Sequence, residues 1–281
     1  MRKILLYALV IVLAVSLIAC NKFTEVQNSN NVSNEQKLQQ PPTSVKTRTF
    51  KDEDLKGAQF EGLDEQGNKL NFQVRDAELD LRDPEKETYL YTVFYLDKSD
   101  KKWKNLCTPD AKNVAKAIPL KGFWDKTGAY IESTNSVTFG CTSGALAKCV
   151  RLGYKPWKSV RGKSLLPFHQ ACTRMIRADY CGNGKSHTRE GTPINIYDVL
   201  NIQKKDPEEK MFFEAAWGPD GATCINRTRW LETLSEIRKE CPAKNTVHIN
   251  NNGSCKTSQK ALQAFPNSLL FNDSLVRKPP S

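Results

Sequence analysis

Three side chains in the middle of the chain could perform acid and base chemistry: His187, Asp179 and Asp198. An imidazole beside a carboxylate can move protons at neutral pH, but their spacing matches no catalytic frame, so only the fold could bring them together. We therefore assign no catalytic residue from the sequence. A hydrolase that uses His187 with Asp179 or Asp198 is kept as the alternative function. A metal held by these three residues is part of the same alternative, but neither a metal site nor a cofactor is expected.

The nine cysteines are the next reactive groups. Cys20 ends an apolar stretch, and the other eight form an even set, which in an exported chain predicts four disulfides. No two cysteines are separated by two residues, so neither a zinc knuckle nor a thioredoxin-like redox pair is indicated. The expected disulfide cysteines are Cys107, Cys141, Cys149, Cys172, Cys181, Cys224, Cys241 and Cys255.

Helical spacing limits how these cysteines can pair. A helix predicted over 142–152 separates Cys141 from Cys149 by roughly 12 Å, and the two cysteines of a helix predicted over 166–180 lie roughly 13 Å apart. A disulfide needs α-carbons within about 7 Å. Both pairings are therefore excluded and bridges are expected between different elements, with the connectivity otherwise open.

The first twenty residues predict export and lipid attachment. A basic head precedes an apolar stretch over 4–18, and Leu17-Ile18-Ala19-Cys20 resembles the cleavage site of bacterial lipoproteins. We expect residues 1–19 to be a signal peptide and Cys20 to carry a lipid that anchors the protein to a membrane. Asn21 follows in place of aspartate, which favours the outer membrane, on its periplasmic face or at the cell surface. A permanent membrane-spanning helix is the less favoured alternative.

Composition divides the rest of the chain. Sixteen of the 29 residues that follow Cys20 as far as position 49 are Asn, Gln, Ser or Thr, which predicts a flexible tether. The predicted organisation is a lipidated cysteine and tether over 20–50, a single compact region over 51–265 (mainly β over 51–141, α+β over 142–265), and a partly ordered tail over 266–281.

The periodicity of apolar residues predicts the fold class. Alternation over 59–63 and 70–74 indicates a β-hairpin, and more strand signals follow. Apolar residues then recur at helical spacing over 142–152 and 166–180, and a third short helix is expected over 231–241. The prediction is an α+β fold, an antiparallel β-rich, disulfide-stapled domain with two central helices and a third short helix.

Several motifs in the central segment occur in a fixed order. They are Gly144 to Arg151, Gly153-Tyr154-Lys155-Pro156-Trp157, His169-Gln170-Ala171-Cys172, Arg177 to Gly182, and His187 to Ile194. Together they resemble the bacterial ADYC-domain family, named for the tetrapeptide Ala178, Asp179, Tyr180 and Cys181. The resemblance covers roughly 117–230 and implies an exported domain without an established activity, so it supplies no catalytic roles.

Asp179 poses an electrostatic problem if the second helix is as long as predicted. It would lie near the C-terminal end, where the helix dipole disfavours negative charge. We expect its carboxylate to accept hydrogen bonds from the loop 182–184 or to pair with Arg177 or Arg189, while Cys181 fixes the loop.

The charge of the chain is unevenly distributed. No Asp or Glu occurs over 133–178, and this stretch, the predicted basic face, contains Lys148, Arg151, Lys155, Lys158, Arg161, Lys163, Arg174 and Arg177. Such a field attracts anionic lipids, lipopolysaccharide or acidic glycans outside the cytoplasm. Neutralisation by acidic neighbours such as Glu208, Glu209, Glu232 and Glu236 is the open alternative.

These observations favour a non-enzymatic binding or interaction module. We expect a lipid-anchored cell-envelope protein whose basic face, 133–178, contacts an anionic glycan, a lipid or a protein partner. A cytoplasmic nucleic acid is not an expected partner. The alternative hydrolase would act in the same compartment.

Overall fold

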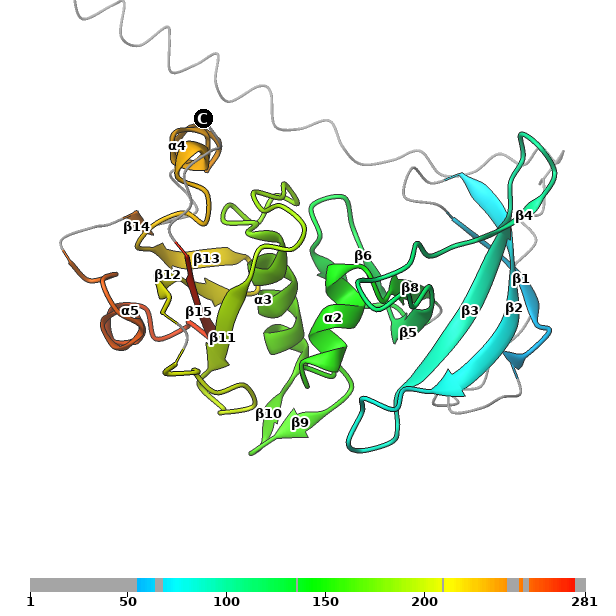
Figure 1. The fold of residues 1–281 in the computed structure, drawn as a ribbon, viewed down its shortest axis with the longest axis horizontal. Helices are drawn as coiled ribbons and strands as arrows, with labels where there is room; N and C mark the ends of the chain where they lie inside the picture. The colour runs from blue at the N-terminus through cyan, green and yellow to red at the C-terminus, as the bar shows by residue number, and fades with distance from the viewer. Residues whose placement is uncertain are drawn as a thin grey trace, which may run out of the picture. The chain divides into compact units, whose positions relative to one another are not determined.

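The protein is described here by a computed structural model in which two β-sheets flank a pair of helices (Figure 1). The structure describes residues 55–63, 68–134, 136–208, 210–241, 248–249 and 253–275. All of these belong to one compact unit of the chain, residues 45–281. Cys20 and the expected signal peptide and tether lie outside the described residues.

The N-terminal sheet has the strand order β1-β2-β3-β5-β8, with β4 pairing beside β3. Its strands are β1 (Gln59–Leu63), β2 (Lys69–Leu79), β3 (Tyr89–Leu96), β4 (Trp103–Asn105), β5 (Ala117–Lys121) and β8 (Val137–Cys141). Phe60 lies opposite Phe72 in the β1–β2 pair, which confirms the predicted hairpin. Alternate residues such as Phe72, Val74 and Val93 form the core on one face of this sheet.

The C-terminal sheet has the strand order β11-β15-β12-β13-β14. Its strands are β11 (Ile194–Asp198), β12 (Phe212–Gly218), β13 (Gly221–Ile225), β14 (His248–Ile249) and β15 (Leu270–Ser274). Neighbouring strands are antiparallel except for β13 and β14. Strand β15 was not predicted, because three of its five residues are polar. Its Asn272 and Asp273 are nevertheless buried, and they accept hydrogen bonds from Trp217 and Tyr197.

Two short hairpins complete the strands of the described residues. They are β6 (Phe123–Trp124) with β7 (Tyr130–Ile131), and β9 (Ser159–Val160) with β10 (Lys163–Ser164). In the first, aromatic residues lie on both sides of a turn. The second connects the two central helices and carries two of the residues of the basic face.

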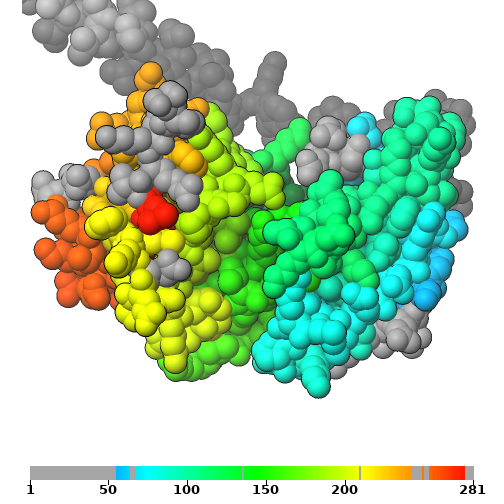
Figure 2. All heavy atoms as spheres, viewed as in Figure 1, coloured from blue at the N-terminus to red at the C-terminus, as the bar shows by residue number. Residues whose placement is uncertain are grey.

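Helices lie between the two sheets and at the edge of the second one. They are α2 (Ala145–Arg151), α3 (Leu166–Arg177), the short 3-10 helix η2 (Leu231–Thr233), α4 (Leu234–Glu240) and α5 (Ser258–Ala264). Helix α2 contacts β8 and α3, and α3 contacts β12, β13 and β15. Figure 2 shows the segment of α2 and α3 set between the segments of the two sheets. The α+β prediction is confirmed, whereas α5 was not predicted.

Helix α3 forms the centre of the larger core. Every residue over 168–175 is buried, because α2 covers one side of the helix and the C-terminal sheet covers the other. The helix ends at Arg177, three residues earlier than the periodicity predicted, because Ala178 adopts a left-handed conformation with φ of 51°. Spacing of apolar residues does not reveal such a stop when the capping residue is alanine rather than glycine.

Four disulfides join different elements, as predicted. They are Cys107–Cys141, Cys149–Cys172, Cys181–Cys241 and Cys224–Cys255, with α-carbons between 5.0 and 5.9 Å apart. The second joins α2 to α3, and the third joins the segment after α3 to the residue after α4. Within the described residues, no helix is long and apolar enough to cross a bilayer.

His169 on α3 is a buried histidine of the core rather than a surface ligand. Its Nε2 lies 3.1 Å from the carbonyl oxygen of Leu146 on α2, and its ring packs edge-on against Trp124. Burial lowers the pKa of His169 to about 4, and the hydrogen bond to the Leu146 carbonyl opposes this only in part. The imidazole is therefore neutral at neutral pH.

The folded protein should lose stability as pH falls from 7 to 4, because the unfolded chain binds a proton at His169 near pH 6.5 and the folded chain does not. The loss due to this group should be about 3 kcal/mol. Urea unfolding of the chain and of its His169→Gln variant between pH 7 and 4 measures it. The variant should show a shallower pH dependence, and equal slopes would contradict the assignment.

Candidate functional site

The Ala178-Asp179-Tyr180-Cys181 tetrapeptide is completely or almost completely buried, and each residue has a separate contact. Ala178 ends α3 through its left-handed backbone. Cys181 forms the disulfide with Cys241. The next residue, Gly182, has φ of 66° and packs against the turn before β13, where a Cβ would collide with the carbonyl oxygen of Asp220. The chain after α3 is therefore fixed in its path.

Asp179 organises the loop that follows. Its carboxylate accepts hydrogen bonds from the backbone N–H groups of Asn183, at 3.2 Å, and Gly184, at 2.9 Å. This confirms the expected bonds from the loop. The predicted cations were wrong: the partner is Arg174, whose Nη1 lies 2.6 Å from Asp179 Oδ2. Because α3 ends early, the chain turns back and brings the carboxylate over the last turn of the helix.

Tyr180 enters a buried polar network with two residues that the sequence analysis did not single out. Its hydroxyl donates to Glu214 on β12, at 2.9 Å, and accepts from the backbone N–H of Arg229, at 2.8 Å. Glu214 and Arg229 form an ion pair at 3.1 Å, and their side chains are at most 1% exposed. Glu214 lies within an otherwise apolar strand, and a buried carboxylate needs a buried cation. This pattern in the sequence could have indicated the ion pair.

Arg229 also caps the C-terminal end of α3. Its guanidinium donates to the carbonyl oxygens of Met175 and Ile176, in the last turn of the helix, and to Thr188 Oγ1 in the following loop. One side chain therefore joins the helix, the sheet and the loop that carries His187.

His187 is buried, but neither of the expected carboxylates is its partner. Within the described residues, no hydrogen bond or ion pair joins His187 to Asp179 or Asp198. Asp198 instead accepts from Tyr154 Oη, at 2.9 Å, and from backbone N–H groups of the turn that begins at Leu200. The three side chains proposed for a hydrolase thus serve separate contacts.

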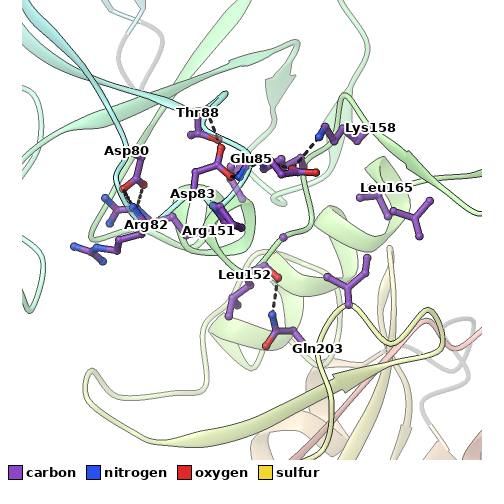
Figure 3. A pocket seen from close by; sticks show the side chains of 16 residues that line it. Asp80, Arg82, Asp83, Glu85, Thr88, Arg151, Leu152, Lys158, Leu165 and Gln203 are labelled. Carbon is purple, nitrogen blue, oxygen red and sulfur yellow. Dashed lines mark hydrogen bonds and ion pairs between the residues drawn. The ribbon is translucent and has the colours of Figure 1, made fainter.

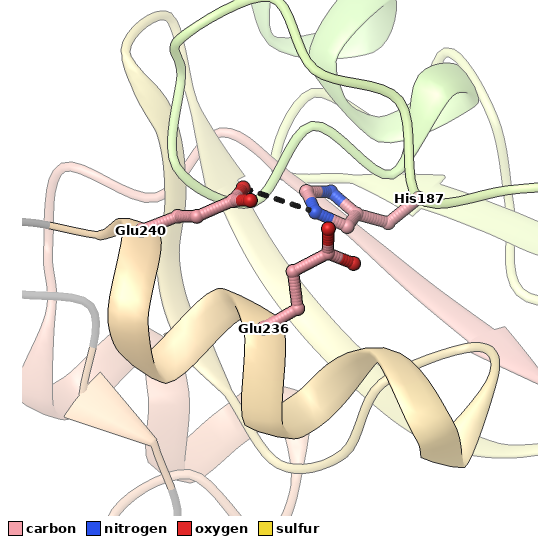
Figure 4. Close-up of side chains that lie close together, drawn as sticks. All are labelled: His187, Glu236 and Glu240. Carbon is pink, nitrogen blue, oxygen red and sulfur yellow. Dashed lines mark ion pairs between the residues drawn. The ribbon is translucent and has the colours of Figure 1, made fainter.

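The carboxylates that do face His187 come from α4 (Figure 4). Glu240 Oε2 lies 3.5 Å from His187 Nε2, and Glu236 is one helical turn away on the same side of α4. Lys185 donates to both glutamates. No sequence signal linked these groups, because the loop and the helix are separated by about fifty residues.

Half of the cations of the basic face are paired with carboxylates of the protein. Arg151 pairs with Asp80 and Asp110, and Arg174 pairs with Asp179. Lys155 and Lys158 pair with carboxylates of the loop between β2 and β3, namely Asp83, Glu85 and Glu87. The neutralising groups were therefore not those suggested by the sequence.

Lys155 is a buried cation that contacts three carboxylates. Its ammonium lies 2.8 Å from Asp83 and also contacts Glu85 and Glu87. Burial by itself would raise the pKa of Asp83, but the hydrogen bonds that it accepts from Lys155, Thr88 and neighbouring backbone N–H groups together outweigh burial and hold the pKa well below its usual range. The contact between the N-terminal sheet and the segment after α2 is therefore an ion-pair network.

A cleft of about 380 Å³ opens beside this network (Figure 3). Its charged walls are the β2–β3 loop and the segment after α2, and its apolar floor includes Val150, Leu165 and Ile202. Because Arg151, Lys155 and Lys158 already contact carboxylates, the cleft presents no unbalanced positive charge to an anion.

Three cations of the basic face form no ion pair with any other described residue: Lys148, Arg161 and Lys163. Arg177 donates to the carbonyl oxygen of Gly184 instead of a carboxylate. Arg161 and Lys163 are exposed on the β9–β10 hairpin. The solvent-facing part of the predicted basic face is thus reduced mainly to this hairpin.

Comparison with known proteins gives one match. A family model described as the ADYC domain matches residues 52–231. No curated protein and no solved structure matches the chain. The matched range also includes the first strands of the N-terminal sheet, so it begins earlier in the chain than the resemblance over 117–230.

The Asp179→Asn substitution should lower the free energy of unfolding by about 2 kcal/mol, because Arg174 and two backbone donors lose a charged acceptor. Urea unfolding measures this, with Asp220→Asn on the exposed neighbouring turn as the control. The control should change stability by less than about 0.5 kcal/mol. Equal stability of the two variants would refute the role of Asp179.

The Lys155→Met substitution should cost about 3 kcal/mol or more, since it leaves the buried Asp83 carboxylate without its cation. Lys163→Met, which removes an exposed cation of the same segment, should be nearly neutral. Chemical denaturation of both variants gives the comparison. A neutral Lys155→Met variant would mean that this lysine is not structural.

Proposed function

We propose a function for this chain, which belongs to the ADYC domain family. It is a lipid-anchored protein of the bacterial cell envelope. It binds anionic lipid head groups and catalyses no reaction. The N-terminal pattern that ends at Cys20 supports lipid attachment. Four disulfides support an oxidising compartment outside the cytoplasm. The outer membrane, on its periplasmic face or at the cell surface, is the proposed location.

The observation that carries the binding proposal is the β9–β10 hairpin. Val160 pairs with Lys163, so Arg161 and Gly162 form a two-residue turn, and both have positive φ values, of 50° and 75°. Tight turns of this kind hold a hairpin in one shape. The tip therefore presents Arg161 and Lys163 outward without an ion-pair partner among the described residues.

Trp157 adds an aromatic group to the same segment. It is 47% exposed, more than any other described tryptophan. Tryptophan beside lysine and arginine suits the boundary between water and lipid, where the ring enters the head-group region and the cations meet phosphates. Acidic glycans and the phosphates of lipopolysaccharide present the same anionic chemistry, so the experiment must distinguish them.

The ion pairs of the other cations support the proposal that the hairpin is the binding site. Arg151, Lys155 and Lys158 are held by carboxylates and cannot bind an external anion without breaking those contacts. Binding energy should therefore come from a few residues at one tip rather than from the whole 133–178 segment. The hydrolase alternative gains no support, because His187, Asp179 and Asp198 have separate partners.

A chain lacking residues 1–20 should bind vesicles that contain anionic lipid. The double variant Arg161→Ser with Lys163→Ser should bind them about 30-fold more weakly, because each cation contributes about 1 kcal/mol to binding. Truncation removes the lipid anchor but keeps all eight paired cysteines. Vesicle co-sedimentation at two salt concentrations measures the effect, and higher salt should reduce binding.

The control variant is Lys98→Ser with Lys102→Ser, which removes two exposed lysines from the loop between β3 and β4. It should leave vesicle binding unchanged. Heparin and lipopolysaccharide beads form the second arm, and retention there without vesicle binding would replace the lipid by a glycan or lipopolysaccharide. Absence of salt-sensitive binding in every arm would refute the proposal.

A further inference from the structure

The contact between the His187 loop and α4 contains two buried polar atoms that lack hydrogen-bond partners. His187 Nε2 and Glu240 Oε2 are both buried and unpaired, and they face each other at 3.5 Å. The His187 side chain is only 1% exposed, so bulk solvent does not reach it. That separation is too long for a hydrogen bond between these two atoms.

The other ring nitrogen determines how Nε2 can react. Nδ1 of His187 lies 3.2 Å from the carbonyl oxygen of Ala178, which can only accept a hydrogen bond. In a neutral imidazole, Nδ1 must then carry the proton, and Nε2 directs its lone pair toward the glutamates. A histidine that ligates a metal is commonly oriented in this way, by a backbone carbonyl at its second nitrogen.

A metal cation between the lone pair and the carboxylate would satisfy both of these buried atoms. We propose that His187, Glu236 and Glu240 together bind Zn²⁺. The three candidate ligand atoms lie within 4.8 Å of one another. Two ligands of a tetrahedral zinc ion are separated by roughly 3.3 Å, given metal–ligand bonds of about 2.0–2.1 Å, so the distance from His187 to Glu240 already fits.

The donor set favours zinc over harder cations. One imidazole nitrogen and two carboxylate oxygens suit Zn²⁺, whereas Ca²⁺ requires six or more oxygen ligands. Three protein ligands leave the fourth position for water or for another ligand. Glu236 is partly exposed, which leaves a path from solvent to the site.

Lys185 competes for the same carboxylates. Its ammonium donates to Glu236 and to Glu240, so a positive charge already lies beside the oxygens that would bind the metal. Lys185 is itself 45% exposed and can swing into solvent when Zn²⁺ enters. Its removal should therefore strengthen metal binding, which a purely structural ion pair does not predict.

The Cys181–Cys241 disulfide holds the two halves of the site together. His187 follows Cys181 by six residues, and Glu240 directly precedes Cys241, whose α-carbon is 5.0 Å from that of Cys181. Glu236 and Glu240 lie one turn apart on α4 and so share a face. The spacing of cysteines and histidines along the chain indicated no metal site, because these ligands come from two distant segments.

Isothermal titration of the full-length chain in detergent with Zn²⁺ alone tests the proposal, after treatment with a chelator. We expect one ion per chain. Glu240→Gln and Glu236→Gln should each weaken zinc binding at least about tenfold, because each removes one carboxylate ligand. Lys185→Met should strengthen zinc binding about fivefold, because it removes the competing ammonium. Ca²⁺ should not bind at comparable concentrations.

Glu232→Gln is the matched control, because Glu232 precedes α4 but pairs with Arg189 outside the cluster. It should leave zinc affinity unchanged. A ¹⁵N NMR spectrum of the histidine rings gives a readout without mutation: Zn²⁺ should shift Nε2 of His187 and not the nitrogens of the buried His169. No binding, binding that survives Glu240→Gln, or an unshifted His187 resonance would each overturn the proposal.

Discussion

The ion pair between Arg229 and Glu214 is the contact on which the C-terminal half of the fold depends. Removing either charge would leave the other buried without a partner, which is among the most costly changes that a core can suffer. Arg229 also donates to the carbonyl oxygens of Met175 and Ile176 at the end of α3. A single guanidinium therefore determines how the helix sits on β12 and where the following loop begins.

The tetrapeptide that names the family follows from this arrangement. A helix that ends against a buried arginine must turn sharply, and Ala178 supplies the turn. The returning chain places Asp179 over Arg174, Tyr180 on the Glu214–Arg229 pair, and Cys181 beside Cys241. Four different chemical groups are needed within four residues, so the motif is explained by folding alone. Its presence is no evidence of catalysis.

Local patterns were sufficient for elements whose stability is local. The β1–β2 hairpin, the central helices and the expectation of disulfides between elements followed from periodicity and cysteine spacing. Contacts between distant segments could not be predicted in this way. The charged stretch 133–178 looks strongly basic when read alone, yet three of its eight cations pair with carboxylates about seventy residues earlier in the chain. Strand β15 was not predicted for the same reason, since its polar side chains bond to residues distant in the sequence, such as Tyr197 and Trp217.

Each of the two proposed binding sites, the β9–β10 hairpin and the His187 cluster, belongs to a segment that a disulfide closes or fixes. The Cys149–Cys172 bridge closes the segment that contains the β9–β10 hairpin, and the Cys181–Cys241 bridge fixes the loop of His187 against α4. A short loop whose base is covalently fixed loses little conformational entropy when it binds a ligand. Few contacts are then enough for useful affinity. The crosslinks thus serve the candidate sites as directly as they serve the core.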